Sequence, residues 1–524
     1  MNSGAIYING NIYTVDDSFS KASVVAVNGD RIVYVGNDHD EAALSVKGTA
    51  EVIDLNGKTV IPGLIEGHMH FQSEGQVSLN INAFKLSKER ILELVKEKAG
   101  SLKPGEWIQG SGWNHMEWPD HAWPSKDELD FVSPDNPAML HRTDLHSIWV
   151  NSIALSKSGI TEDTQNPQGG EIVKDKNGRP LGILVDTARH PVFNAIPAVS
   201  DEMKLKAYRL AQDECFSYGL TSIFDAGASF DEINILKGAY ASGELKLRVY
   251  ETLTASDDSD IKYIEAGFSP VRGLYNNRLS INAVKIFADG SVGSRSALFF
   301  DDYDDRPGHK GKGVYTDEEL YKIVNRASRY GFQIATHAIG DAAIRQVMDV
   351  YERVQNEQSL TDSRFRIEHF LVPEPSDITR AVKLGFVTTL QASGADPDLD
   401  MLKERLGTER AGRSYVWREL IEAGGYIVGG SDANVDLLNP YYGIHAGVAG
   451  VGGRGLTREE SLKSYTIWAA KGQFEEDVKG SLEVGKLADF VVLDRDIMTC
   501  PLADMRDAHA LLTVLGGEAV YGKI

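Results

Sequence analysis

Short apolar segments separated by amphipathic stretches dominate the middle of the chain. Eight of them have the length and the Val, Ile, Leu and Phe content of buried strands. They are residues 59–68, 220–227, 245–253, 281–290, 332–337, 364–370, 386–391 and 426–432. Helical patterns lie between most of them, at 203–217, 318–330, 341–357, 375–384 and 457–471. Eight strands that alternate with helices predict an α/β chain folded as a (β/α)8 TIM barrel.

The two ends of the chain are rich in strands instead. Asn-Gly pairs at 9–10 and 28–29 separate runs rich in Ile, Val and Tyr and predict β-hairpins. The last part of the chain has the same style around the Gly-Gly pair at 516–517. Because chain termini often lie close together, we expect a small β-sandwich domain built from residues 1–60 and 478–524.

A long stretch interrupts the barrel domain, which we place at residues 61–477. Residues 71–202 separate the first and second predicted strands and are rich in Trp, His, Pro and Gly. They form an insertion in the first βα loop, at the end of a barrel where loops build the active site. We therefore expect a lid, with Trp113, His141 and His146 as candidate substrate contacts.

Composition narrows the range of partners and compartments. Lys and Arg number 54 against 76 Asp and Glu, and a net charge of −22 argues against nucleic acid or an anionic membrane as partner. Two cysteines make neither a disulfide framework nor a Cys-based zinc site. No signal peptide and no apolar run of about 20 residues is present, so a cytoplasmic location is expected. We expect a small-molecule substrate and leave the oligomeric state open, a homo-oligomer being one option.

The first barrel strand ends in His68-Met69-His70. Residues i and i+2 of a strand point the same way, so both imidazoles can face the barrel axis and share one metal ion. A His-x-His is often incidental by itself. This one follows a buried-strand pattern, IPGLIEG, at the end of the barrel where catalysis takes place.

Four other strands carry candidate ligands. Lys285 interrupts the apolar run of strand four, His337 and His369 close strands five and six, and Asp432 closes strand eight. Each alone could be a core residue or a helix cap, but the combination is improbable by chance. Imidazole nitrogen and carboxylate oxygen suit zinc or a related divalent metal. Glu368 precedes a ligand on its strand, so we expect it to point outward and to serve in packing or an ion pair.

These features together resemble the amidohydrolase superfamily. The motifs VKIFADGSVGSRSA, ATHAIGDAA, HRTDLHSIWVNSIAL and the GSD strand end are similar to its amidohydrolase-3 branch, the YtcJ-like and N-substituted formamide deformylase group. The resemblance implies one metal bound by the HxH pair and the strand-eight Asp, and a second bound by the strand-five and strand-six His and bridged by a carbamylated strand-four Lys. The ligands would be His68, His70, Asp432, His337, His369 and Lys285. One departure is Asp186 in GILVDTA, a further candidate substrate contact, where that branch often has Glu.

The expected chemistry follows from the residue types. A divalent metal lowers the pKa of coordinated water toward about 7 and so supplies a nucleophile at neutral pH. Asp432 can take the proton of that water and pass it to the leaving amine. A metal, or His337 or His369 close by, would stabilise the oxyanion. The sequence therefore predicts a hydrolase acting on an amide, N-acyl or N-formyl bond, a carbon–nitrogen bond other than a peptide bond.

Three questions stay open from the sequence. Deamination of a ring or opening of a cyclic amide could use the same site, because fold and metal do not fix the substrate. A non-catalytic relative of the barrel is a further alternative, disfavoured because buried His and Asp without metal would be costly. The identity of the metal, the number of ions, and a plain Lys285 that contacts a carboxylate such as Asp289 or Asp186 also remain undecided.

Overall fold

Eight parallel strands form a central barrel sheet. The computed structural model describes residues 4–142, 147–167, 170–255 and 258–524, and within them each barrel strand pairs in parallel with the next along the chain. The strands are β8 (Leu64–Met69), β15 (Leu220–Ala228), β16 (Arg248–Thr254), β18 (Leu279–Phe287), β19 (Gln333–Ala338), β20 (Arg366–His369), β21 (Val387–Leu390) and β22 (Ile427–Gly429). All eight predicted segments contain or overlap one of them, and the predicted barrel is confirmed.

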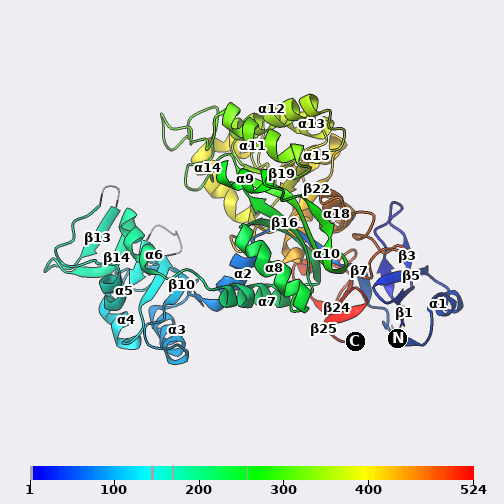
Figure 1. Cartoon of the computed structure of the whole chain (residues 1–524), viewed down its shortest axis with the longest axis horizontal. Helices are drawn as coiled ribbons and strands as arrows, with labels where there is room; N and C mark the ends of the chain where they lie inside the picture. Colours follow the sequence, from blue (N-terminus) through cyan, green and yellow to red (C-terminus); the bar gives the residue numbers. More distant parts are fainter. Residues whose placement is uncertain (1–3, 143–146, 168–169, 256–257) are drawn as a thin grey trace. The chain divides into compact units, whose positions relative to one another are not determined.

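The barrel strands are buried on both faces, as is typical of parallel sheets. In β18, eight of the nine residues of LSINAVKIF are buried. Helices α11 (Asp317–Arg329) and α12 (Asp341–Gln358) lie on the outer side of β19 (Figure 1). The apolar face of α11 follows from its spacing, since Leu320, Ile323, Val324 and Ala327 are all buried at i, i+3, i+4 and i+7.

The other described helices outside residues 72–211 surround the barrel, except for α1, which packs on a sheet formed near the N-terminus. They are α1 (His39–Ser45), α8 (Phe230–Ser242), α9 (Asp258–Glu265), α10 (Leu274–Asn277), α13 (Pro375–Lys383), the short 3-10 turn η3 (Ala392–Gly394), α14 (Ala395–Ala411), α15 (Trp417–Glu422), α16 (Pro440–Ala449), α17 (Arg458–Ser464), α18 (Ile467–Gly472) and α19 (Leu502–Met505). A short strand, β17 (Val271–Gly273), pairs antiparallel with β18. Among the described helices, none is both long and apolar enough to cross a bilayer.

The first and last barrel strands meet at a seam that we define by β8 and β22. Beyond the end of β22, Asp432 N donates to His68 O over 2.7 Å, and His70 N donates to Ala433 O over 2.5 Å. The buried carboxylate of Glu66 also bridges the seam, because its Oε1 accepts from His68 N at 3.0 Å and from Ser431 N at 2.8 Å. The barrel is therefore closed at the level of the HxH motif.

A two-layer β-sandwich combines both ends of the chain. One sheet has the order β5-β4-β1-β6 and the other the order β25-β24-β23-β7-β2-β3, in which β7 from the N-terminal part pairs antiparallel with β23 from the C-terminal part (Figure 1). Tyr7, Val25 and Val27 of the first sheet pack against Val60 and Phe490 of the second. The strands are β1 (Gly4–Ile8), β2 (Asn11–Tyr13), β3 (Lys21–Ala22), β4 (Val24–Asn28), β5 (Arg31–Gly36), β6 (Ala50–Asp54), β7 (Thr59–Pro62), β23 (Phe490–Leu493), β24 (Ala510–Leu515) and β25 (Glu518–Gly522).

The predicted hairpins of these ends have different outcomes. The turns at 28–29 and 516–517 join the antiparallel pairs β4–β5 and β24–β25, as predicted. The hairpin predicted at 9–10 is wrong, because β1 and β2 belong to different sheets. Asn9 has a φ of 56°, and its turn carries the chain from one sheet to the other. The predicted strand 59–68 is likewise divided, since β7 joins the sandwich and β8 the barrel.

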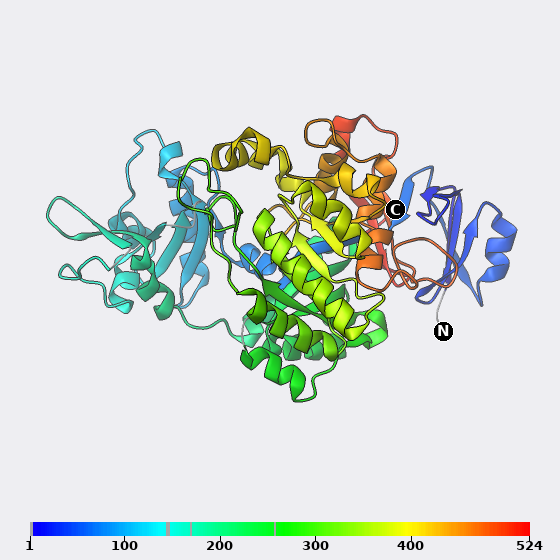
Figure 2. The same cartoon turned by 90° about the horizontal axis from the view of Figure 1, so that it is seen from above.

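Residues 72–211 form a second compact unit with its own sheet. The strand order is β13-β14-β12-β11-β10-β9, and Trp113, Trp118 and Trp149 lie in its core. Its elements are β9 (Ile81–Asn82), α3 (Lys88–Ser101), β10 (Ile108–Trp113), η1 (His115–Glu117), α4 (Lys126–Val132), β11 (Ala138–Arg142), β12 (Ser147–Val150), α5 (Ser152–Lys157), β13 (Gly170–Lys174), β14 (Pro180–Asp186), η2 (Thr187–Arg189) and α6 (His190–Ala195), with α2 (Phe71–Leu79) and α7 (Asp201–Ser217) at the two joins (Figure 1). Figure 2 shows the same elements from above. The domain boundaries and the lid inferred from the sequence stay predictions.

Candidate metal centre

Three of the predicted ligands converge at the seam of the barrel. His68 lies in β8, His70 follows it, and Asp432 lies beyond β22. Asp432 Oδ1 is 3.4 Å from His68 Nε2 and 3.4 Å from His70 Nε2. One ligand atom from each residue lies within 4.8 Å of the others. The backbone hydrogen bonds across the seam hold this spacing.

The donor set of this cluster fits a divalent metal ion. His68 Nε2 and Asp432 Oδ1 are buried and have no hydrogen-bond partner among the described residues, so their lone pairs face the space between them. Burial would raise the pKa of Asp432, but contacts with His68 and His70 hold it well below its usual value. An ionised carboxylate beside two imidazoles is a donor set that zinc and related ions accept.

His337 and His369 stand beside this cluster. The two imidazole rings are 4.4 Å apart, and the His369 ring is 5.1 Å from that of His68. Burial lowers the pKa of His369 to about 4, and burial, followed by the charges of His369 and Lys285, lowers that of His337 well below its usual value. Both rings are therefore neutral at physiological pH, which is the form that binds metal.

Hydrogen bonds orient these two rings. His369 Nδ1 donates to Gln391 Oε1 over 2.8 Å, and His337 Nε2 donates to the carbonyl oxygen of Gly290 over 3.3 Å. The other nitrogen of each ring is left as an acceptor.

Lys285 is fully buried on β18. Its Nζ lies 4.9 Å from the centre of the Phe287 ring and has no hydrogen-bond partner among the described residues. Burial lowers the pKa of Lys285, although the carboxylates of Glu368 and Asp432 act in the opposite direction. Asp289, one carboxylate considered for it, instead accepts backbone N–H groups of Leu298, Ile339 and Gly340.

Two of the predicted ligands adopt backbone conformations that side-chain-bearing residues rarely use. His369 has a φ of 74° and Asp432 a φ of 62°, both in the left-handed region. Such conformations persist where the surrounding structure enforces them, and they concentrate at functional sites. They end the regular alternation of side chains along β20 and after β22.

The expectation that Glu368 points outward is wrong. Its side chain is completely buried and accepts a hydrogen bond of 2.6 Å from His68 Nδ1. It also forms the expected ion pair, with Arg366, at 2.7 Å. Alternation places Glu368 on the same inward side as Arg366, and it fails one residue later, where the left-handed φ of His369 lets that side chain approach the barrel axis too.

Other buried polar residues near the strand ends were not found from the sequence. Burial raises the pKa of Glu66 and of Asp225 to about 7. Asp225 Oδ1 accepts from Phe71 N at 3.1 Å, next to His70, and Gln391 holds His369. The position of Gln391 at the end of the strand pattern FVTTLQ is the one signal that could have indicated it.

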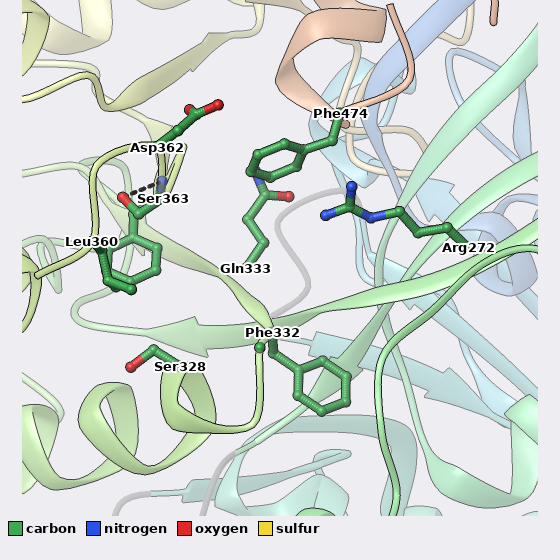
Figure 3. A pocket seen from close by; sticks show the side chains of 10 residues that line it. Arg272, Ser328, Phe332, Gln333, Leu360, Asp362, Ser363 and Phe474 are labelled. Atoms are coloured by element: carbon green, nitrogen blue, oxygen red, sulfur yellow. Dashed lines mark hydrogen bonds between the residues drawn. The ribbon is translucent and has the colours of Figure 1, made fainter. Parts of the chain in front are cut away.

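A pocket of about 570 Å³ opens beside the cluster. His337, His369 and Asp432 line it from the strand ends, and Ser291 and Tyr415 are among the other lining residues. Its volume suits a small molecule. A smaller pocket of about 160 Å³, lined by Arg272, Gln333 and Phe474 among others, lies where β19 begins, away from its ligand-bearing end (Figure 3).

The predicted substrate contacts of the insertion belong to the second unit. Trp113 is buried in the core of that unit, and its Nε1 donates to Leu140 O over 2.7 Å. His141 is partly buried, and burial followed by the charge of Arg189 lowers its pKa. His146 and the side chain of Asp186 lie outside the described residues. A role in substrate binding stays a prediction for all four.

The barrel and the cluster at its strand ends define a class, that of metal-dependent hydrolases. Comparison with solved structures agrees: the chain is similar to an uncharacterized metal-dependent hydrolase from Pyrococcus furiosus, with a TM-score of 0.80 and 26% identity over 95% of this chain and 100% of the other. The sequence profile of the amidohydrolase family matches residues 51–521. The chain therefore belongs to the amidohydrolase family and is a hydrolase acting on non-peptide carbon–nitrogen bonds.

Three curated relatives match almost the whole chain. Protein LONG AFTER FAR-RED 3 of Arabidopsis thaliana is 33% identical over 98% of this chain and 91% of its own length. The putative amidohydrolase YtcJ of Bacillus subtilis is 30% identical over 99% of both chains. The N-substituted formamide deformylase of Arthrobacter pascens is 28% identical over 98% of this chain and 97% of its own. The resemblance drawn from the sequence motifs is confirmed.

Proposed function

We propose that this hydrolase cleaves the carbon–nitrogen bond of a small amide, an N-acyl or N-formyl compound. It uses one or two divalent metal ions, and zinc is the metal that we propose. The observation that carries the proposal is the cluster of His68, His70 and Asp432, whose ligand atoms lie within 4.8 Å of one another beside a pocket for a small molecule. The similarity to a protein named N-substituted formamide deformylase supports the N-formyl class among the candidates.

In this proposal the ligands form two groups. His68, His70 and Asp432 hold one ion, and His337, His369 and Lys285 complete the second. Two observations support the assignment: the imidazoles of His337 and His369 are neutral because burial lowers their pKa, and the acceptor atoms of His68 and Asp432 face one another without a hydrogen bond among the described residues.

The protein residues provide proton transfer and orientation. When bound, the metal supplies Lewis-acid chemistry, acidifying water and polarising the scissile carbonyl. Asp432 accepts the proton of the attacking water on its carboxylate and delivers it to the amine nitrogen as the carbon–nitrogen bond breaks. His337 and His369 line the pocket as neutral rings, and their free nitrogens would hold the ion that polarises the carbonyl group there.

Lys285 is proposed to act as its carbamate. Its buried position lowers the pKa of the amine, and a neutral amine adds to the carbon of carbon dioxide and releases one proton. The product places two oxygens and a negative charge where the bare ammonium would lie without a hydrogen-bond acceptor among the described residues. These oxygens suit a bridge between two ions.

The insertion 71–202 is proposed to act as a lid on the active site. It follows β8 directly, and loops after barrel strands line active sites. His141→Ala and Trp113→Phe should raise KM or change substrate preference while metal content stays intact. Unchanged kinetics on every accepted substrate would reduce the insertion to a structural role.

A substrate screen with defined metal content tests the function. The protein is stripped with a chelator, reloaded with zinc or manganese, and offered N-formyl amines, N-acyl amines and cyclic amides. We expect metal-dependent release of a free amine from the first two groups, and Asp432→Asn serves as the matched inactive control. A protein that binds no metal, or that turns over only ring-deamination substrates, would contradict the proposal.

A further inference from the structure

We propose that Glu368 is a positioning residue, which fixes the tautomer and the orientation of His68 and so sets the metal affinity of the His68–His70–Asp432 cluster. The inference rests on the proposed function only in taking this cluster as a metal site. It is carried by a buried network of hydrogen bonds behind His68, on the side of the ring that faces away from Asp432.

The network begins at the carboxylate of Glu368. Glu368 Oε2 accepts hydrogen bonds from His68 Nδ1 at 2.6 Å and from Thr389 Oγ1 at 2.7 Å. Glu368 Oε1 accepts from Arg366 Nε at 2.7 Å. All four side chains are buried, so water does not compete for these hydrogen bonds.

Arg366 ties the network to the strand that carries His68. Its Nη2 donates to Gly67 O over 2.8 Å, next to His68 in the chain. Its guanidinium lies 3.7 Å from the centre of the Phe224 ring, and that ring stacks on His68 at 6.4 Å. The His68 ring is thus held at its Nδ1, along one face and through its backbone neighbour.

The hydrogen bond determines which nitrogen of His68 carries the proton. A carboxylate paired with a guanidinium only accepts hydrogen bonds, so Nδ1 carries the proton and donates. Nε2 then presents its lone pair to the space beside Asp432 Oδ1, 3.4 Å away. A ring flip or the other tautomer would break the 2.6 Å hydrogen bond without a replacement acceptor.

The carboxylate nearest to the second pair of predicted ligands is farther away: Asp289 Oδ1 lies 3.6 Å from His337 Nε2. His369 Nδ1 donates to the neutral amide oxygen of Gln391, and His337 donates to a backbone carbonyl. A carboxylate makes an imidazole a stronger donor to metal than a neutral acceptor does. The 2.6 Å hydrogen bond from His68 to Glu368 is therefore the strongest support of this kind for a predicted metal ligand among the described residues.

Paired variants allow the test to avoid an uncompensated buried charge. Removing Glu368 alone would leave Arg366 buried without a counter-charge, which is strongly destabilising. We therefore compare two double variants. The Leu pair, Arg366→Met combined with Glu368→Leu, removes the hydrogen-bond acceptor. The Gln pair, Arg366→Met combined with Glu368→Gln, keeps a neutral acceptor. Glu251→Gln is the matched control, since Glu251 is a buried barrel carboxyl with its own hydrogen bond to Thr252 N.

The first measurement is the zinc dissociation constant, by competition with a chelator, for each folded full-length variant. The Leu pair should bind zinc about 10- to 100-fold more weakly than the wild type, the Gln pair should lie between them, and Glu251→Gln should match the wild type. Equal dissociation constants in the wild type and both pairs would overturn the inference while leaving the proposed function standing.

The second measurement uses metal-free protein with ¹⁵N-labelled histidine. At a pH at which the ring is neutral, the wild type should show His68 as a single Nδ1–H tautomer, and the Leu pair a tautomer mixture. A tautomer mixture in the wild type would overturn the inference, whether or not the protein binds zinc. Failure to bind zinc would instead contradict the proposed function. If the Leu pair fails to fold, Thr389→Val provides the same two readouts, with a smaller shift expected in each.

Discussion

Replacing Asp432 with Asn separates proton transfer from every other role of this residue. The carboxamide has the same shape and keeps an oxygen beside His68 and His70, but it cannot accept a proton at neutral pH. The two backbone hydrogen bonds that close the barrel, Asp432 N to His68 O and His70 N to Ala433 O, involve no side-chain atom and remain. The substitution should therefore leave the fold intact.

The expected losses differ for stability and for turnover. The Oδ1 atom makes no hydrogen bond to the described residues, but its contacts with His68 and His70 hold the pKa of Asp432 low, so the free energy of unfolding of the metal-free protein should fall by about 1 to 2 kcal/mol at neutral pH. A general base contributes roughly 10²- to 10⁴-fold to a rate. At about 1.36 kcal/mol per factor of ten, this corresponds to about 3 to 5 kcal/mol of barrier.

The assay is kcat as a function of pH at saturating metal, with metal content measured in the same samples, because the neutral amide is also a weaker ligand. Asp362→Asn is the control, because Asp362 is exposed and lines the smaller pocket where β19 begins. An Asp432→Asn variant with wild-type kcat across the pH range at full metal occupancy would refute the general-base role.

Three further outcomes are expected. His68→Ala and His70→Ala should each lose metal on dialysis, because both ligate from one strand; full metal content in either would contradict the HxH assignment. Lys285→Ala should lose activity and regain part of it when short-chain carboxylates are added. If the variant keeps its metal but the carboxylates restore no activity, Lys285 acts as a plain lysine. Asp489→Asn should lower the free energy of unfolding by about 3 to 5 kcal/mol in denaturant, since it leaves Arg248 buried without its counter-charge and without one of its two hydrogen bonds, which are 2.6 and 2.9 Å long. Burial would raise the pKa of Asp489, but Arg248 holds it below the usual value. This stabilisation is therefore present above pH about 3.9 and is lost as the pH falls through the folded-state pKa. If the free energy of unfolding of the variant fell with decreasing pH in the same way as that of the wild type, the prediction would be wrong.

The strands of the barrel and the residues at their ends were predictable because both depend on local patterns. A short apolar run predicts a buried strand, and the end of that run places His337 or His369 at the barrel mouth. Two features depended on backbone geometry that the pattern does not contain. Arg366 and Glu368 share the inward face of β20, and the left-handed φ of His369 brings that next residue inward as well; the turn at Asn9 joined two sheets instead of one hairpin.

Residues that act through a neighbouring strand escaped prediction for a different reason. Gln391 follows β21 and holds His369 on β20, so its role depends on the register between two strands. Glu66 connects β8 to Ser431 beyond β22, residues that are far apart in the sequence. The sequence of one strand carries no information about which atoms of the next strand will face it.

A metal ion at the seam between β8 and β22 would also stabilise the fold. The two backbone hydrogen bonds that close the ring lie at His68, His70 and Asp432, the same residues whose side chains approach one another there. An ion on these residues would cross-link the first and last strands of a ring, two segments that lie far apart along the chain. Occupancy would then contribute RT ln(1 + [metal]/Kd) to the free energy of unfolding, and loss of the ion would leave the seam held by its hydrogen bonds alone. Chelation should thus speed amide hydrogen exchange at His70 and Asp432 first.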